Sequence, residues 1–240
     1  MNDWVCNNQL TINTNKTKFI LISRWRNLPK NFPPLYINNI QIESVLHFKY
    51  FGVWISDDLT WSKHVESICC KARCILGHMS RTFSPHCNQD SIIALYKCQV
   101  LPILEYACIV LKRDQLLLES VQLFATRMAA HSWTSDSESL NHHFQLPSLS
   151  SHWTYFKVLS TYKCLNSYTF CPPGNFSLHA NPNLRVCHCK QLVVSFAKTS
   201  AFYNSFFISS ARLWNSLPSH VILCANVSTF KNAVKPFLLG

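Results

Sequence analysis

The first 60 residues carry short apolar runs of the kind that forms β-strands. An apolar run at 19–22, bounded by polar residues, predicts a buried strand. Two more runs, at 35–37 and 40–42, flank an Asn-Asn pair. Asparagine tolerates the positive φ of a tight turn, so these runs predict a hairpin. Residues 48–55 (FKYFGVWI) are rich in aromatic and β-branched side chains and are the strongest strand candidate.

From about residue 60 the apolar spacing changes to three or four residues, which is typical of amphipathic helices. The first stripe consists of Val65, Ile68, Cys69, Ala72, Leu76, Met79 and Phe83. A second helix is expected over 90–111, with a kink at Pro102 because proline has no backbone N–H to donate. Further helices are expected over 114–130 and 150–167. The stripe of the helix over 114–130 consists of Leu117, Val121, Phe124 and Met128.

These patterns predict an α+β chain in four parts. Residues 1–60 form the strand-bearing part, 61–130 a helical part, 131–150 a linker and 151–240 a second helical region. Proline and glycine predict a loop at 169–190 within the last part.

Composition favours a folded chain. Hydrophobic residues make up 48% of the 240 and charged residues 14%, whereas disorder needs low hydrophobicity and high charge. No apolar run reaches the roughly 18 residues that a membrane helix needs. The N-terminus has no basic segment followed by an apolar stretch, so no secretory signal is expected. We therefore expect an intracellular protein, nuclear or cytoplasmic, with no membrane partner.

The charge is strongly positive. Lysine and arginine number 22 against 11 acidic residues, a formal net charge of +11. This excess favours a phosphate-rich partner or an anionic surface, and the alternative is a basic protein without such a partner. Glycines number only 4, and neither GxGxxG nor a P-loop is present. Dinucleotide-binding and P-loop enzymes are therefore excluded.

Residues that often bind metals or attack substrates form no motif. The 12 cysteines contain no CxxC, and Cys187-His188-Cys189 is too tightly spaced for a zinc finger, so we expect reduced thiols. The 11 histidines belong to no HExxH, and GxSxG is absent, which disfavours a hydrolase or protease. Asp57 and Asp58 form an acidic pair of the kind that binds catalytic Mg²⁺. Their place between a strand and a helix favours a turn or cap instead.

Basic residues lie among aromatic ones near the N-terminus. Lys16 and Lys18 precede the segment Arg24-Trp25-Arg26, and Lys49 is followed by Tyr50. Lysine and arginine neutralise phosphates while tyrosine and tryptophan stack on bases, so this pattern is compatible with nucleic-acid binding. The alternative is a solvated basic face above core aromatics.

Several segments, read in order, resemble the reverse transcriptases of non-LTR (LINE-type) retrotransposons. The first is WVCNNQLTINTNKTK at 4–18, and the second is FKYFGVWISDDLTWSKH at 48–64. The third is YKCQVLPILEYA at 96–107, which is followed by a helix motif at 119–127. The last is NSFFISSARLWNSLP at 204–218. The second segment carries Phe51 where the family usually has leucine.

This resemblance implies the C-terminal edge of a palm-type sheet with a primer-grip hairpin, then a helical thumb. It also implies that the catalytic aspartates, the fingers and most of the palm lie upstream of Met1. Mg²⁺ would serve the parent enzyme, and we expect no catalytic residue, metal site or cofactor in this chain and no polymerisation by it alone. The expected partner is an RNA or DNA primer–template. The residues implied to contact it are Lys16, Lys18, Lys49, Tyr50, Phe51, Gly52, Val53, Lys63, Lys71 and Arg73.

Two alternatives remain open at this point. One is a basic nucleic-acid-binding module without catalysis. The other is a non-functional relic that does not fold, because an incomplete sheet leaves an exposed edge and uncovered apolar faces.

Overall fold

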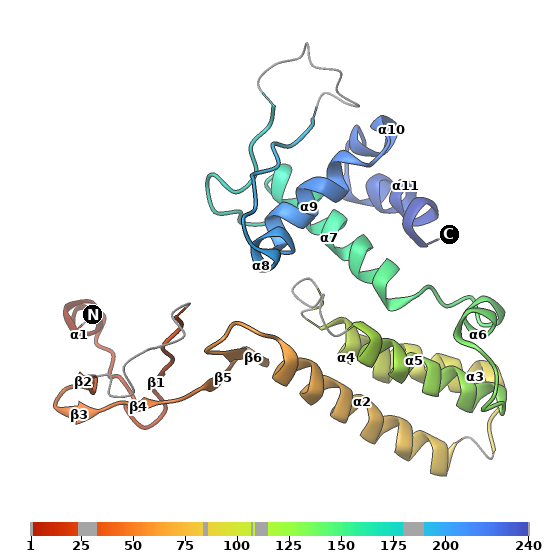
Figure 1. The fold of residues 1–240 in the computed structure, drawn as a ribbon, viewed down its shortest axis with the longest axis horizontal. Coiled ribbons are helices and arrows are strands. Elements are labelled where there is room, and N and C mark those ends of the chain that lie inside the picture. The colour runs from red at the N-terminus through yellow and green to blue at the C-terminus, as the bar shows by residue number, and fades with distance from the viewer. Residues whose placement is uncertain are drawn as a thin grey trace. The chain divides into compact units, whose positions relative to one another are not determined.

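The computed structural model describes residues 2–23, 33–83, 86–106, 108, 115–179 and 190–239. The chain forms two compact units, Met1–Ser67 and Ile68–Gly240. The first unit carries the strands and the second is helical, so the chain mixes helices with small sheets, as the sequence predicts in general terms (Figure 1).

The first unit consists of one short helix and six short strands among the described residues. These are α1 (Asn2–Asn7), β1 (Lys18–Phe19), β2 (Tyr36–Ile37), β3 (Ile40–Gln41), β4 (Glu43–Ser44), β5 (His47–Tyr50) and β6 (Val53–Ser56). The strands pair only two by two: β1 with β4 in parallel, and β2 with β3 and β5 with β6 antiparallel.

The hairpin predicted around the Asn-Asn pair is confirmed. Asn38 and Asn39 join β2 to β3 with φ of 50° and 62°, the left-handed geometry of a two-residue hairpin turn. The buried strand predicted at 19–22 is wrong in extent and burial. Strand β1 ends at Phe19, which is half-buried, and Ile22 is exposed.

The single strand predicted at 48–55 is also wrong, because the chain turns back on itself there. Phe51 and Gly52 both have positive φ, 45° and 81°, and they connect β5 to β6 as a two-residue turn. The turn divides the apolar run into two strands of four residues each. Residues 47–56 therefore form a β-hairpin.

The second unit consists of helices. They are α2 (Ser62–Thr82), which begins in the first unit, α3 (Gln89–Leu95), α4 (Leu101–Glu105), α5 (Gln115–Ala130), α6 (Ser137–His143), α7 (Leu149–Leu165), α8 (Ser200–Tyr203), α9 (Phe206–Asn215), α10 (Ser219–Ile222) and α11 (Val227–Leu239). The stripe predicted for α2 is confirmed from Val65 to Met79, whose side chains are buried. Its last predicted member, Phe83, is wrong, because α2 ends at Thr82 and Phe83 is half-buried in the turn that follows.

The helix predicted over 90–111 is interrupted by a π-helical turn before it reaches Pro102, the residue at which the sequence predicts a kink. A π-helical turn, η1 (Tyr96–Val100), separates α3 from α4, and the N–H of Leu101 donates to the carbonyl of Tyr96 five residues before it. Pro102 then lies in the first turn of α4, where a helix needs no N–H from it. Helix α4 ends at Glu105, short of the predicted end at 111.

The buried face of α5 differs from the predicted stripe. Leu118, Val121, Ala125 and Met128 are buried, whereas the ring of Phe124 is 38% exposed. The region 131–150, predicted as a linker, contains helix α6. Asp136 begins this helix by accepting from the N–H groups of Glu138 and Ser139.

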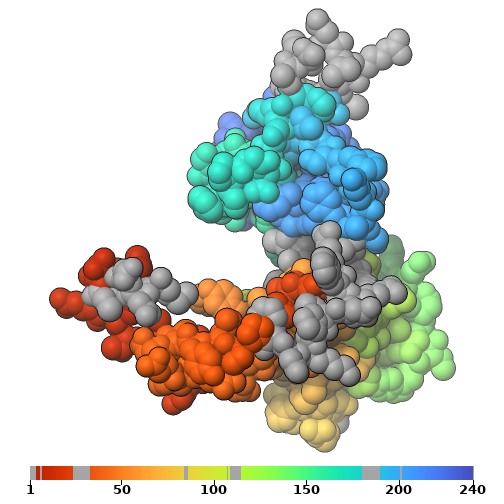
Figure 2. Space-filling view, turned by 60° about the vertical axis from the view of Figure 1, so that its left-hand side comes forward, coloured from red at the N-terminus to blue at the C-terminus, as the bar shows by residue number. Residues whose placement is uncertain are grey.

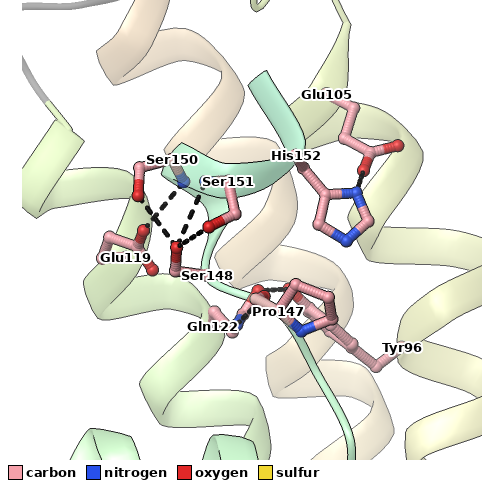
Figure 3. A network of polar contacts seen from close by, with 9 residues as sticks. All are labelled: Tyr96, Glu105, Glu119, Gln122, Pro147, Ser148, Ser150, Ser151 and His152. Carbon is pink, nitrogen blue, oxygen red and sulfur yellow. Dashed lines mark hydrogen bonds and ion pairs between the residues drawn. The ribbon is translucent and has the colours of Figure 1, made fainter. Parts of the chain in front are cut away.

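A buried polar network ties η1 to α5 and to the segment before α7 (Figure 3). The Tyr96 hydroxyl lies 2.9 Å from Oε1 of Gln122, to which it donates. Gln122 Nε2 donates to Oδ1 of Asn141 at 3.2 Å and to the carbonyl of Pro147 at 3.1 Å. Gln122 is 2% exposed and Tyr96 is 0% exposed, so the network replaces the water that both side chains lose.

The N-terminus of α7 is held by side chains from two helices (Figure 3). Ser148 accepts from the N–H of Ser151, and Oε1 of Glu119 accepts from the N–H of Ser150 at 3.2 Å. Nδ1 of His152 lies 2.7 Å from Oε1 of Glu105. Burial raises the pKa of the Glu119 carboxyl, although the N–H groups of Ser150 and Leu149 act in the opposite direction.

The C-terminal helices enclose an aromatic core. The Phe230 ring stacks on Tyr162 with centroids 4.0 Å apart, and Trp214 lies 6.0 Å from the same ring. All three are almost fully buried, and the Tyr162 hydroxyl donates to the carbonyl of Cys224. In Figure 2 the segment after α7, in teal, and the blue C-terminal helices form one continuous mass.

Part of the loop predicted at 169–190 is described. Leu178 forms an antiparallel bridge with Leu192, and no helix or longer strand occurs in its described part, 169–179 and 190. The Cys187-His188-Cys189 segment lies outside the described residues. No helix in the described parts of the chain is long and apolar enough to cross a membrane.

Candidate nucleic-acid interface

The β5–β6 hairpin brings together most of the residues that the sequence singled out. The register pairs Lys49 with Trp54 and Tyr50 with Val53, on either side of the turn. Because side chains alternate along a strand, these two pairs lie on opposite faces of the hairpin.

One face presents two ammonium groups beside an indole ring. Lys49 Nζ lies 5.9 Å from the centroid of Trp54, its cross-strand partner. Lys63, from the first turn of α2, places its Nζ 4.8 Å from the same ring. The ring holds two positive charges by cation–π attraction, and both lie within reach of solvent.

The turn itself presents two aromatic rings. Tyr50 is 57% exposed and Phe51 is 78% exposed, and their ring centroids lie 4.4 Å apart in an edge-to-face arrangement. A phenylalanine rarely adopts the positive φ that Phe51 has, since its Cβ crowds the backbone there. The turn therefore holds a large apolar ring in water at a conformational cost.

Gly52 and Val53 have structural roles in this hairpin. Gly52 has φ of 81°, which glycine adopts without strain, and it completes the turn. Val53 begins β6 and is half-buried opposite Tyr50. We therefore assign these two residues to the shape of the hairpin and the rings of Tyr50 and Phe51 to its exposed surface.

The acidic pair after β6 shapes the connection to α2. Asp58 Oδ1 accepts from the N–H of Thr60 at 2.9 Å and from its hydroxyl at 2.8 Å. The N–H of Thr60 is the main cause of the lowered pKa of this carboxyl. The turn predicted for the acidic pair is confirmed at Asp58. Among the described residues no three His, Cys, Asp or Glu side chains gather as a metal site requires.

The two lysines of the N-terminal segment differ in their surroundings. Lys18, in β1, forms an ion pair with Glu43, its partner in β4. Lys16 lies in the preceding turn, is exposed, and takes part in no ion pair among the described residues. Lys16 is therefore the more available of the two for an anion. The Arg24-Trp25-Arg26 segment lies outside the described residues.

Lys71 and Arg73 belong to the second unit. Both are exposed on α2. Arg73 Nη2 donates to the hydroxyl of Ser120 at 3.2 Å, which ties α2 to α5. Arg73 thus has a structural contact, whereas Lys71 projects into solvent.

Trp54 is the interface residue that sequence reasoning missed. The feature that could have identified Trp54 is the hairpin register, because a two-residue turn at Phe51 and Gly52 places Trp54 directly opposite Lys49. If residues 48–55 formed one continuous strand, Lys49 and Trp54 would not be cross-strand partners.

Comparison of this chain with protein families, with curated proteins and with solved structures finds no match.

Proposed function

We propose that this chain binds nucleic acid through the β5–β6 hairpin, as the primer-holding and thumb part of a reverse transcriptase of the non-LTR retrotransposon type. The observation that supports the proposal most strongly is the placement of Lys49 and Lys63 around Trp54, beside a turn with exposed aromatic rings. The proposal assigns no catalytic residue to this chain.

The two parts of the hairpin suit two parts of a nucleic acid. Lys49 and Lys63 supply charge for phosphates, and contacts of this kind release bound counterions and do not depend on base sequence. The exposed rings of Tyr50 and Phe51 supply faces on which a terminal base can stack. The end of a nucleic-acid strand that lies across the turn would contact both the two lysines and the two rings. Holding a primer terminus requires this arrangement.

The net charge of the chain agrees with this use. An excess of 11 positive charges attracts a polyanion from a distance, and screening by salt weakens that attraction. Affinity for a primer–template should therefore fall steeply with salt and vary little with sequence.

The test measures binding of a labelled duplex with a recessed 3′ end, by fluorescence anisotropy, over a range of salt concentrations. The double variant Lys49→Ser/Lys63→Ser should reduce the slope of log affinity against log salt by about 2, one for each lost phosphate contact. The matched control is Lys97→Ser/Lys235→Ser, which removes the same charge from exposed positions in the second unit.

A second variant isolates the aromatic contribution. Phe51→Asn retains a residue that tolerates positive φ, so the turn is preserved while the ring is lost. Affinity for the recessed end should fall about 5-fold or more with an unchanged salt slope, because stacking contributes about 1–3 kcal/mol per base.

Three outcomes would contradict the proposal. They are the absence of binding by the native chain, equal losses in the lysine pair and its control, and equal affinity for recessed and blunt duplexes. The last outcome would leave general binding of nucleic acid without a grip on the primer end.

A further inference from the structure

A second polar site lies between α7 and α9, within the helical unit. It is a pocket of about 330 Å³ whose polar lining comes mainly from these two helices. The residues with polar side-chain atoms that line it include Ser150, Trp153, Thr154, Lys157, Ser209 and Arg212. No aspartate or glutamate lines the pocket, so its fixed charge is positive.

The guanidinium group of Arg212 is held rigidly at this pocket. Nη2 donates to the carbonyl of Tyr203 at 2.6 Å, and Cζ lies 3.4 Å from the centroid of the Tyr203 ring. The stacked ring and the carbonyl fix the plane of the guanidinium. Its Nε–H is buried and has no acceptor, and neither ion pair among the described residues involves Arg212.

A second buried donor in the lining is also without an acceptor. Trp153 is 4% exposed, and its indole Nε1 makes no hydrogen bond. Buried donors are almost always paired, because an unpaired one has lost its water and gained nothing. Two unpaired donors from helices about 60 residues apart in the sequence, at one pocket, indicate an acceptor that binds there.

The chemistry of the lining defines that acceptor. Arg212 and Lys157 carry positive charge, and Trp153 adds an N–H that only donates. The hydroxyls of Thr154 and Ser209 already donate to the carbonyls of Ser150 and Phe206, so the charged groups and the indole are the donors that matter. A phosphate group has several acceptor oxygens and a double negative charge, so it can satisfy donors that approach from several sides. The pocket volume also exceeds what a bare phosphate ion occupies, which leaves space for a small organic group beside Tyr203 and Leu213.

We propose that this pocket binds the phosphate group of a small phosphomonoester, with Arg212 and the Trp153 indole N–H as its main contacts. This site is separate from the hairpin and does not depend on the function proposed for it.

The test is isothermal titration calorimetry of the full chain with inorganic phosphate, glycerol phosphate and adenosine 5′-monophosphate, with adenosine as the uncharged control. All three phosphates should bind saturably and adenosine should not. Similar affinity for all three would identify the phosphate alone as the recognised group, and tighter binding of one ester would identify its organic part.

Trp153→Phe separates binding from folding. The variant keeps an aromatic ring but removes the unpaired donor together with part of a buried ring, so thermal stability should fall modestly from the lost volume while the fold is retained. Its affinity for phosphate should fall at least 5-fold. The matched control, Trp133→Phe, makes the same change at an exposed tryptophan outside the pocket and should bind as the native chain does.

A second variant, Arg212→Gln, should abolish saturable binding. The proposal is overturned if phosphates do not bind, if adenosine binds as well as its monophosphate, or if the two tryptophan variants behave alike. Lys49→Ser/Lys63→Ser should leave phosphate binding unchanged, which distinguishes failure here from failure of the hairpin proposal.

Discussion

Replacement of Gln122 by methionine tests whether the buried network holds the helical unit together. Methionine has nearly the same volume and fits an irregular core, so the change removes polar groups with little loss of packing. The Tyr96 hydroxyl then has no acceptor, and Asn141 and the carbonyl of Pro147 each lose one donor.

The magnitude follows from the burial of each group. The Tyr96 side chain is 0% exposed, so its unpaired hydroxyl should cost about 1–3 kcal/mol. Asn141 and Pro147 are half-buried and can bind water instead, so together they should add about 1 kcal/mol. Gln122→Met should therefore lower the free energy of unfolding by about 2–4 kcal/mol.

A double-mutant cycle with Tyr96→Phe isolates the hydrogen bond. In the native background Tyr96→Phe leaves Oε1 of Gln122 buried and unpaired, at a cost of about 1–3 kcal/mol. In the Gln122→Met background the same change removes a group that is already unpaired, so it should cost almost nothing. The two changes should therefore couple by about 1–3 kcal/mol.

The assay is urea unfolding followed by far-ultraviolet circular dichroism, which reports the helical unit. The control is Gln99→Met, at an exposed position of η1, which should change stability by less than about 0.5 kcal/mol. Additive effects within about 0.5 kcal/mol in the cycle would refute the reasoning, since they would show that Tyr96 and Gln122 do not depend on each other.

Three further changes test other parts of the fold. Gly52→Ala places a Cβ at φ of 81° and should weaken the hairpin by about 1–2 kcal/mol, seen as 5- to 30-fold faster amide exchange in β5 and β6; unchanged exchange would contradict the turn geometry. Phe230→Ala empties a fully buried ring position and should cost about 3–5 kcal/mol in urea unfolding, whereas a loss below 1 kcal/mol would mean that this core is not formed. Burial raises the pKa of the Glu119 carboxyl above its usual range, so the folded chain binds this proton more tightly than the unfolded chain. Stability therefore falls as the pH rises from the pKa of the unfolded state through that of the folded state. Glu119→Gln keeps a carbonyl for the Ser150 N–H, and urea unfolding at pH 4 and pH 7 should show a gain over the native chain at pH 7 only; equal shifts at both values would contradict the pKa direction.

The strongly periodic parts of the fold were predictable from sequence. The α2 stripe repeats every three or four residues over about four turns, which places Val65, Leu76 and Met79 on one buried face. The β2–β3 turn was predictable because two asparagines tolerate the φ values that it needs. In both cases the local preference and the tertiary structure agree.

The β5–β6 hairpin, the candidate interface and the pocket could not be predicted in the same way, because they depend on contacts between residues that a local sequence pattern does not show. The aromatic residues on both sides of Gly52 give the sequence pattern of one continuous strand. The positive φ values of Phe51 and Gly52, which divide this segment into two strands, are not visible in that pattern. The candidate interface places Lys49 and Lys63, which belong to different elements, around one ring. The pocket proposed for phosphate is lined by Trp153 and Arg212 from two helices, and their unpaired donors are visible only in three dimensions.

The π-helical turn η1 has a consequence for the rotational phase of its helix. Ile92, Tyr96, Val100 and Leu104 are all buried, at strict intervals of four residues. In a continuous α-helix each such interval advances about 40° beyond a full turn, so Leu104 would point about 120° away from Ile92. The π-helical turn rotates the chain by a smaller angle per residue than an α-helix does. It therefore offsets part of this 120° rotation and keeps the four side chains close to one side of the helix. Deletion of one exposed residue from η1, such as Cys98, would leave Leu104 eleven residues after Ile92, about 20° beyond three α-helical turns. The helix could then regain its α-helical pitch with Leu104 still directed to the core.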